Sequence, residues 1–311
     1  MGTYILKRIF MLIPVLLGIS LLIFAIAKIT PGDPAAIMAF PNTTPARIEY
    51  LRHQLGLDQP IYIQYGRFLW NALHGDLGVS YRGSVPVLRD ILDRLPSTIE
   101  LTMAALAITI VVGITLGVMA ASNRNNFVDN TIMLTALTGL SIPSFYLGIL
   151  TIIIFAADLK WVSATGGPGL KNLILPAIAL AAAPTAVMIR LTRASMLEVV
   201  SKDYVRTARA KGLKERIILV RHILRNSLIP IATFLGLLTA NLIVGAVFIE
   251  TVFARPGLGR FLVSAIIARD FPQVQGAVLF SASAFVGLNL FIDILYGIID
   301  PRIRLEDKEV G

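Results

Sequence analysis

Six long apolar runs divide this chain, and charged residues collect between them. About 20 consecutive apolar residues are enough to cross the hydrocarbon core of a bilayer. A segment in lipid must satisfy its backbone hydrogen bonds internally, which favours helices. The pattern therefore predicts an all-α membrane protein with six transmembrane helices. The runs free of Asp, Glu, Lys and Arg cover residues 9–27, 101–121, 130–157, 172–189, 226–249 and 271–292.

The first run has an alternative interpretation as a signal peptide. Lys7 and Arg8 precede it, and Ala25-Ile26-Ala27 resembles a cleavage site at its end. The run is long for a signal peptide, and its removal would leave five spans. Both interpretations stay open at this point, and a transmembrane helix is favoured.

Composition supports the membrane assignment. Hydrophobic residues make up 56% of the 311 residues and charged residues only 15%, whereas soluble domains contain about 25% charged residues. The net charge of +9 would indicate nucleic-acid binding in a soluble protein, but here it indicates basic cytoplasmic loops facing anionic lipid. No nucleic-acid partner is expected. The absence of cysteine and the wide separation of His53, His74 and His222 predict no disulfide and no metal site.

The distribution of basic residues predicts the orientation. Six spans place both termini on one side, and short loops rich in Lys and Arg remain in the cytoplasm. With a cytoplasmic N-terminus, 16 basic residues lie inside and 5 lie in the two short outer loops. The loop over residues 29–96 is long and carries six Arg and six acidic residues, so it does not affect this comparison. We expect a short amphipathic helix at 46–57, in a loop that is either solvated or forms a small outer cap.

The spans contain little chemistry of their own. The stretch "GGPGLKN" at 166–172 lacks the ending of a phosphate-binding P-loop. Prolines at 143, 176 and 184 predict kinks. Asp293 is the deepest charged residue, and it is either a gate or relay group or a structurally paired carboxylate. Asn241 is one of several uncharged polar residues that either line a wet path or join helices.

The most charged helical stretch, "DYVRTARAKGLKERIILVRH" at 203–222, lies between the fourth and fifth spans. Its pattern predicts a helix, a turn at Gly212 and a second helix. One apolar stripe consists of Leu197, Val200, either Tyr204 or Val205, and Ala208. The second consists of Leu213, Ile217, Ile218 and Leu224. Such a segment either docks in a groove of a partner or rests on anionic lipid.

This stretch and the following "RHILRNSLIP" resemble the cytoplasmic signature loop of inner-membrane permease subunits of ABC transporters. The resemblance is to the dipeptide, oligopeptide and nickel branch, and to its B-type subunit. Arg206-Thr207-Ala208 occupies the Glu-Ala-Ala positions of the family pattern, so its Glu is missing here. Further similar segments run in order along nearly the whole chain: "PGDP" (31–34), "GDLGVSY" (75–81), "RLPSTIEL" (94–101), "TGLSIPSF" (138–145), "RLTRASMLEV" (190–199), "VFARPGLGRFLVSAI" (252–266), "RDFPQVQG" (269–276) and "IDPRIR" (299–304).

The resemblance implies a type I ABC importer permease in the bacterial inner membrane. It implies three kinds of partner: a second homologous permease, two cytoplasmic ATPases that bind ATP and Mg, and an extracytoplasmic solute-binding protein. The chain itself is then not an enzyme and binds no cofactor. Residues implied in ATPase coupling are Arg206, Thr207, Ala208, Gly212, Leu213 and Ile217, and possible gate or structural residues are Asp293, Asn241, Pro256 and Gly257.

The resemblance also implies an organisation and a cargo. Residues 1–95 hold the first span and the outer loop, residues 96–304 form a permease core with a coupling loop at 190–226, and residues 305–311 form a cytoplasmic tail. The expected cargo is di- or oligopeptides, with nickel chelates or glutathione as alternatives. The competing hypotheses are an autonomous channel or ion-coupled transporter, and a membrane scaffold without a transport role.

Overall fold

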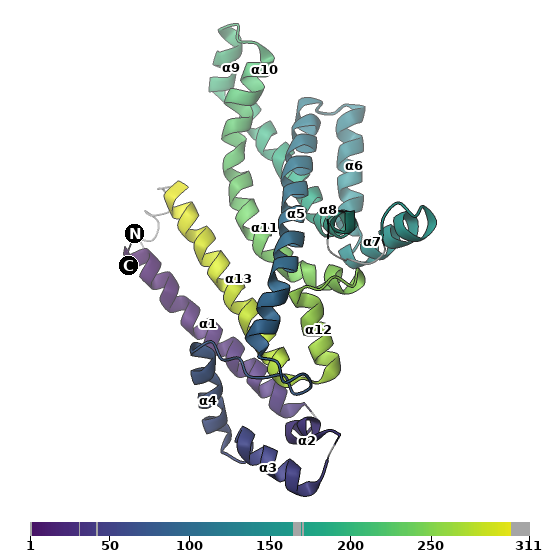
Figure 1. The fold of residues 1–311 in the computed structure, drawn as a ribbon. Helices are drawn as coiled ribbons and strands as arrows, with labels where there is room; N and C mark the ends of the chain where they lie inside the picture. Colours follow the sequence, from purple (N-terminus) through teal and green to yellow (C-terminus); the bar gives the residue numbers. More distant parts are fainter. Residues whose placement is uncertain (1, 31, 42, 164–168, 170, 300–311) are drawn as a thin grey trace. The chain divides into compact units, whose positions relative to one another are not determined.

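The described part of the chain is helical (Figure 1). The computed structural model describes residues 2–30, 32–41, 43–163, 169 and 171–299. Five helices are long and apolar enough to span a membrane, and a bent pair of helices brings the number to six. The predicted all-α membrane fold is therefore confirmed. The five single helices are α1 (Gly2–Ile29), α5 (Val87–Ser122), α8 (Lys171–Val200), α11 (Arg225–Val252) and α13 (Phe271–Ile299).

The third predicted span is not one helix. Helix α6 (Phe127–Ser141) ends, and α7 (Ser144–Thr151) with the π-helix η1 (Ile152–Asp158) continues at an angle of 101°. Ile142 has extended backbone angles, φ −91° and ψ 122°, because the ring of Pro143 disfavours a helical conformation in the preceding residue. By contrast, α8 continues through both Pro176 and Pro184. Only the first of the three prolines thus coincides with a break.

Several helices extend beyond the apolar runs or lie outside them. Helix α5 begins at Val87 and α8 continues to Val200, so the segment expected as a loop from residue 190 is helical at first. The segment between the first two spans contains α2 (Pro34–Ala39), α3 (Pro45–Leu55) and α4 (Ile61–Leu73), and α3 confirms the helix expected at 46–57. Sequence reasoning missed α12 (Leu258–Ala268), because eleven residues are too short to span a membrane.

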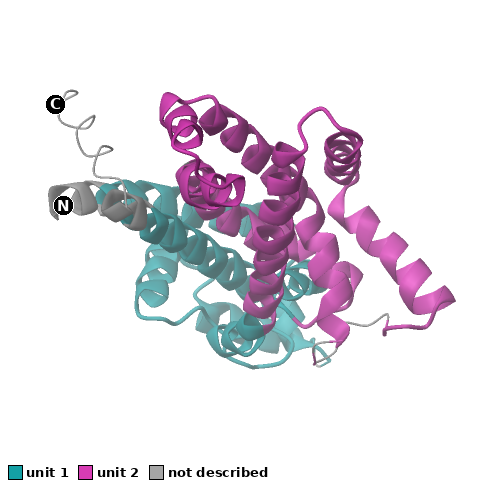
Figure 2. Cartoon of the chain, turned by 90° about the horizontal axis from the view of Figure 1, so that it is seen from above, with its two compact units in different colours: residues 1–96, 257–311 teal, residues 97–256 magenta. Residues whose placement is uncertain are grey.

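The chain forms two compact units (Figure 2). The first consists of the described parts of residues 1–96 and 257–311. Within it α1 packs along α13, α12 packs on α13, and α2 packs on α3. Its buried core joins the start of α5 to α12 and α13 through Val87, Ile91, Leu258, Phe261 and Ala277.

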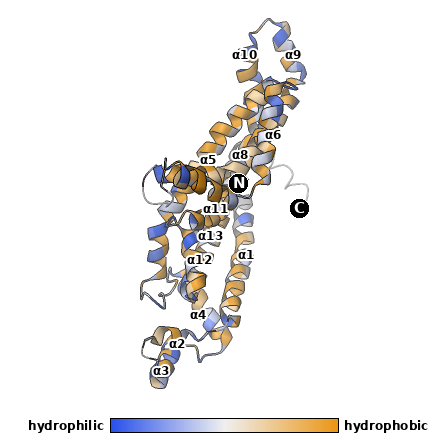
Figure 3. Cartoon of the chain, turned by 90° about the vertical axis from the view of Figure 1, so that its right-hand side faces the viewer, coloured by the Kyte–Doolittle hydropathy of each residue, from blue (hydrophilic) through white to orange (hydrophobic). Residues whose placement is uncertain are grey.

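The second unit comprises residues 97–256 and is built around α8. Helices α6, α7 and α11 all pack on α8, and 61% of its most apolar window is buried, against at most 28% in the other spans. Small residues such as Ala177, Ala179 and Ala181 make this close packing possible. Figure 3 shows the hydrophobic colour following the long helices, with hydrophilic patches at the α9–α10 end and around α3.

Helices α5 and α8 approach each other closely at two glycines of α5. A Cβ atom on Gly113 would lie 2.5 Å from Cγ of Met188, and one on Gly117 would lie 2.5 Å from Cβ of Thr192. Gly113 and Gly117 are four residues apart, which is the small-xxx-small spacing that lets transmembrane helices touch. The spacing is visible in the sequence, but it does not by itself identify α8 as the partner of α5.

We expect the Gly117→Ala variant to be less stable than the unsubstituted protein. The added methyl group would meet Thr192 and, at 2.9 Å, the carbonyl oxygen of Ile189, and such overpacking costs about 1–3 kcal/mol. Gly18→Ala is the matched control, because no heavy atom lies within 4 Å of its added methyl. Thermal unfolding of both variants in detergent checks this expectation, and equal melting temperatures would contradict the close α5–α8 contact.

Candidate functional site

The candidate site is the hairpin that joins α8 to α11 in the second unit, defined as residues 203–224 (Figure 1). It consists of α9 (Asp203–Ala210), a turn at Lys211–Lys214, α10 (Glu215–Ile217) and the π-helix η2 (Ile218–Leu224). Gly212 has φ +74°, and its N–H donates to the carbonyl of Arg209 at 2.9 Å. A residue with a side chain would pay about 1–2 kcal/mol for this left-handed conformation. The predicted helix–Gly–helix pattern is confirmed.

One face of the hairpin packs on the C-terminal ends of α5 and α8. Val205 and Ala208 of α9 and Ile218 and Ile223 of η2 are buried in one cluster, which also contains Ala121 and Met196. Of the two alternatives for the first apolar stripe, Val205 faces inward, whereas Tyr204 is partly exposed and its hydroxyl accepts a 3.0 Å hydrogen bond from Asn226. The inward cluster fixes the position of the hairpin on its own unit.

The other face presents apolar side chains outward. Leu213 is 39% exposed and Ile217 is 42% exposed, while the next residue, Ile218, is fully buried. The residues of the predicted second stripe therefore do not share one face, because Leu213 and Ile217 face away from the cluster that holds Ile218. Five basic residues of the same hairpin are also exposed: Arg206, Lys211, Lys214, Arg216 and Arg221.

An ion pair ties the two arms of the hairpin together across its turn. Nε of Arg209 donates to Oε1 of Glu215 at 2.8 Å, and this hydrogen bond raises the pKa of Arg209. Both side chains are partly exposed, so the pair contributes about 0–1 kcal/mol. The burial of Val205 and Ile218 stabilises the hairpin more strongly, by roughly 1.5–3 kcal/mol for each fully buried side chain.

A buried ion pair lies near the base of the hairpin. Nε and Nη2 of Arg193 on α8 donate to the two carboxylate oxygens of Asp129 on α6, at 2.6 and 2.7 Å. Asp129 also accepts from the backbone N–H of Asn125 at 2.9 Å and is only 1% exposed. Sequence reasoning did not identify this pair, although Asp129 directly precedes the third apolar run.

A second polar cluster in this unit joins the end of α11 to α5. Thr98 donates to the Glu250 carboxylate at 2.6 Å, and Arg255 pairs with Glu100 and donates to the Ser97 carbonyl at 3.3 Å. The position of Glu250 near a span end predicts a side chain that reaches the interface. The side chain is instead completely buried, because Thr98 supplies a hydrogen bond inside the unit.

The remaining sequence candidates do not gather at one place that the structure describes. Asn241 is exposed on α11 and donates to the carbonyl of Leu237 at 3.1 Å. Pro256 is exposed, and Gly257 is buried at the start of α12. Asp293 belongs to α13, but its side chain and the tail at 305–311 lie outside the described part of the chain. Their predicted roles as gate or structural residues stay predictions.

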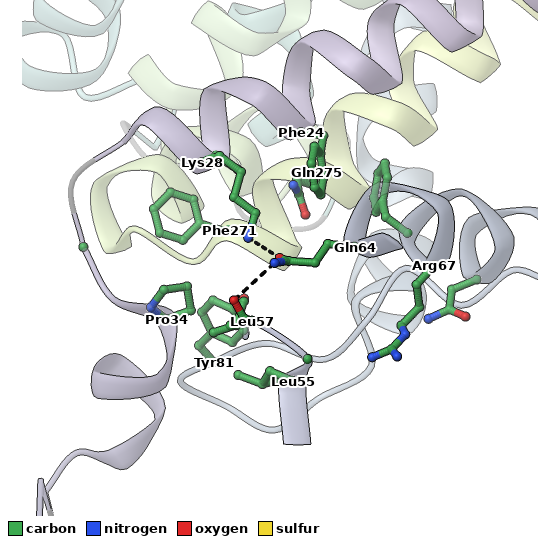
Figure 4. A pocket seen from close by; sticks show the side chains of 15 residues that line it. Phe24, Lys28, Pro34, Leu55, Leu57, Gln64, Arg67, Tyr81, Phe271 and Gln275 are labelled. Atoms are coloured by element: carbon green, nitrogen blue, oxygen red, sulfur yellow. Dashed lines mark hydrogen bonds between the residues drawn. The ribbon is translucent and has the colours of Figure 1, made fainter. Parts of the chain in front are cut away.

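The first unit contains a cavity of about 240 Å³ (Figure 4). Lys28 at the end of α1 donates to the side-chain carbonyl of Gln64, whose amide in turn donates to the carbonyls of Leu57 and Gln59 at 3.2 and 2.6 Å. Phe24, Phe68 and Phe271 are among the aromatic residues in its wall. Sequence reasoning did not find this cavity, because its residues come from segments more than 200 positions apart.

A buried carboxylate stabilises the wall of the cavity behind Tyr81. Ser80 donates to the Asp270 carboxylate at 2.6 Å, and both side chains are buried. Burial, together with the nearby charge of Asp270, raises the pKa of Tyr81 to about 12. The phenol therefore stays neutral at any physiological pH.

Two family models match the chain. The one described as "Binding-protein-dependent transport system inner membrane component" matches residues 113–305, and its N-terminal counterpart matches residues 1–102. In the solved structures, a chain of an amino acid ABC transporter crystallised with histidines has a TM-score of 0.53 at 14% identity, covering 69% of this chain and 94% of that one. This likeness shows the fold, which is that of type I ABC importer permeases.

Curated relatives match along almost the full length. A putative peptide transport system permease protein of Brucella abortus (strain 2308) is 47% identical, covering 98% of this chain and 100% of the relative. The glutathione transport system permease protein of Escherichia coli (strain K12) is 41% identical, covering 98% and 99%. The dipeptide transport system permease protein of Alkalihalophilus pseudofirmus is 39% identical, covering 98% and 100%.

We expect Asp129→Asn to weaken the base of the hairpin. The substitution leaves the partly buried Arg193 guanidinium without its charged partner, and removing one member of a buried pair costs roughly 3–5 kcal/mol. Asp203→Asn is the control, because Asp203 is 3.8 Å from Arg206 in an exposed pair and its loss costs about 0–1 kcal/mol. Limited proteolysis of the hairpin in purified protein reports the difference, and equal cleavage rates in the two variants would contradict a structural role for the buried pair.

Proposed function

Because this chain belongs to the family of inner membrane components of binding-protein-dependent transport systems, we propose that it imports short peptides as one transmembrane subunit of an ATP-driven transporter. In this proposal the chain forms half of the translocation pathway and is not itself an enzyme. Work comes from two cytoplasmic ATPase subunits, which hold ATP and Mg, and the chain binds no cofactor. The observation that carries the proposal is the hairpin, which is held to its own unit on one face and leaves the apolar side chains of Leu213 and Ile217 partly exposed on the other.

The outward face is suited to a partner's groove. Leu213 in the turn is 39% exposed and Ile217 at the end of α10 is 42% exposed, so burying the remaining surface of each against a partner would gain about 1 kcal/mol per residue. The exposed Arg and Lys side chains of the hairpin favour an acidic groove and steer its approach. Among the proposed coupling residues, Arg206 and Thr207 are exposed and positioned to contact the ATPase, whereas Ala208 acts from inside by holding α9 on its unit.

Coupling requires the hairpin to move together with the spans. Its inward cluster includes Met196 of α8, and η2 continues directly into α11. A push on the exposed face is therefore transmitted into two of the long helices and not absorbed in a flexible loop. This arrangement suits an importer that alternates between inward-open and outward-open states.

The proposed setting is the bacterial inner membrane with both termini in the cytoplasm. Its support is the excess of basic residues in the segments that then lie inside, which includes the ten Lys and Arg between positions 190 and 225. The partners in this setting are a second homologous permease, two ATPases and an extracytoplasmic solute-binding protein.

Short peptides are the proposed cargo because three relatives carry the words peptide, dipeptide and glutathione in their names. Glutathione, a tripeptide derivative, is the second candidate, supported by the relative from Escherichia coli. The alternative of nickel chelates has no comparable support among these three relatives.

The test of this proposal is uptake of a labelled dipeptide by cells that lack the chromosomal copy. We expect the unsubstituted chain to restore uptake, Gly212→Val to restore little of it, and Gly212→Asn to restore most of it. Valine is strained at φ +74°, whereas Asn tolerates the left-handed conformation. Both variants should insert normally, since no heavy atom lies within 4 Å of an added Cβ.

Two outcomes would contradict the proposal. If Gly212→Val supports full uptake, the hairpin is not the coupling element. If the purified chain alone moves the dipeptide into liposomes down a gradient, it is an autonomous transporter. If unlabelled glutathione inhibits uptake at a lower concentration than the unlabelled dipeptide does, glutathione is the preferred cargo.

A further inference from the structure

Two neighbouring helices in the outer loop differ sharply in character. Helix α3 has the sequence PARIEYLRHQL, with two Arg, one Glu and one His in eleven residues. Helix α4 has the sequence IYIQYGRFLWNAL, with Arg67 as its one charged residue. Yet α4 exposes large apolar side chains: Ile61 is 65% exposed, Tyr62 75%, Trp70 65% and Leu73 81%. A loop that lies entirely in water would not be expected to expose such a surface.

The contacts of α4 place it beside a membrane-spanning helix and not beyond its end. The Tyr65 hydroxyl lies 2.9 Å from the Ser20 hydroxyl, and the Phe68 ring stacks on Phe24 at 6.0 Å between centroids. The apolar span of α1 runs to Ile29, nine residues past Ser20. At 1.5 Å per residue, Ser20 lies about 13 Å inside the end of the span.

The two faces of α4 match this position. The inward face carries Gln64, Phe68 and Asn71 toward the cavity, together with Arg67, whose Nη2 donates to Oε1 of Gln59 at 2.9 Å. The outward face follows the helical repeat through Tyr62, Gly66, Leu69 and Leu73, with Trp70 at its edge. Among these five residues, the polar side-chain groups are the Tyr hydroxyl and the Trp N–H. Tyr and Trp are the residues that concentrate where a bilayer meets water.

We propose that the outward face of α4 is embedded in the lipid of the bilayer surface, so that α4 is an interfacial helix and not part of a solvated loop. The partner of this face is the acyl-chain and headgroup boundary, because the exposed side chains are apolar or aromatic and lie beside a helix at membrane depth. The leaflet is the outer one if the orientation proposed above holds, but insertion itself does not depend on the transport function.

This placement gives α4 a mechanical role. It anchors the segment that carries α2 and α3, in which Arg52 pairs with Asp33 at 2.7 Å, to the membrane surface. The cavity lined by Lys28 and Gln64 then opens close to the headgroup region. The outer loop is thereby a cap held in place by lipid on one face and by α1 on the other.

Spin labels on single cysteines test this inference in the full chain, copurified with its partner subunits and reconstituted in phospholipid vesicles. The chain contains no native cysteine to remove. The test positions are Tyr62→Cys and Leu73→Cys on α4. Leu22→Cys on α1, 60% exposed, is the lipid reference, and Tyr50→Cys on α3, also 60% exposed, is the water reference.

Collision rates with oxygen, which concentrates in lipid, and with a water-soluble nickel chelate separate three environments. We expect the α4 labels to resemble the Leu22→Cys label, with a high oxygen rate and a several-fold lower nickel rate than Tyr50→Cys. Nickel rates equal to those of Tyr50→Cys would show that the face lies in water. Immobile labels with low rates for both reagents would assign the face to a protein partner, and either result would overturn the inference.

Discussion

The constraint on which the rest of the structure depends is that lipid offers no hydrogen-bond partner to a buried polar group. In the described part of the chain, charged side chains near the spans pair inside the protein, as Arg193 does with Asp129. The fully buried Glu250 accepts from Thr98 for the same reason. Small residues then allow the uncharged helix faces to approach closely, which makes α8 the buried centre of its unit. As a result, the polar and charged side chains that could bind a partner lie in the segments outside the spans, where water is present.

The hairpin at 203–224 is the clearest example of such a place. Two consecutive residues lie on its opposite faces, since Ile217 is partly exposed and Ile218 is buried. The inward residue holds the hairpin to α8, and the outward residue leaves 42% of its surface exposed. The turn at Gly212 permits the reversal that creates both faces, and its φ of +74° is a conformation in which a side chain is strained. The hairpin could therefore act as a lever: its exposed apolar surface would bind the ATPase, and its packed face would transmit the movement to α8.

Hydropathy predicted the spans well, because burying about 20 apolar residues outweighs local preferences. The pattern also predicted the helix–Gly–helix segment and the short helix α3. It predicted a kink at Pro143 but not a full break of 101°. Whether proline kinks or breaks a helix depends on whether neighbouring groups can hydrogen-bond the backbone groups that it frees. It missed α12, which is too short for a span criterion. Pairings such as Asp129 with Arg193, 64 positions apart, require knowledge of which helices touch. The spacing of Gly113 and Gly117 signals a close helix contact, but it does not say which helix is the neighbour.

The most direct test of the lever is site-specific cross-linking from two adjacent residues, Ile217→Cys and Ile218→Cys, in a chain that has no other cysteine. Inside-out vesicles stripped of the ATPase subunits are treated with a thiol-reactive, photoactivatable reagent, the ATPase subunits are added back, and the chain that is cross-linked on illumination is identified. The lever predicts an adduct between Ile217→Cys and an ATPase subunit, and little reaction at Ile218→Cys. Equal reaction at both positions, or reaction at Ile217→Cys only when the reagent is applied to the outer face of the membrane, would contradict it.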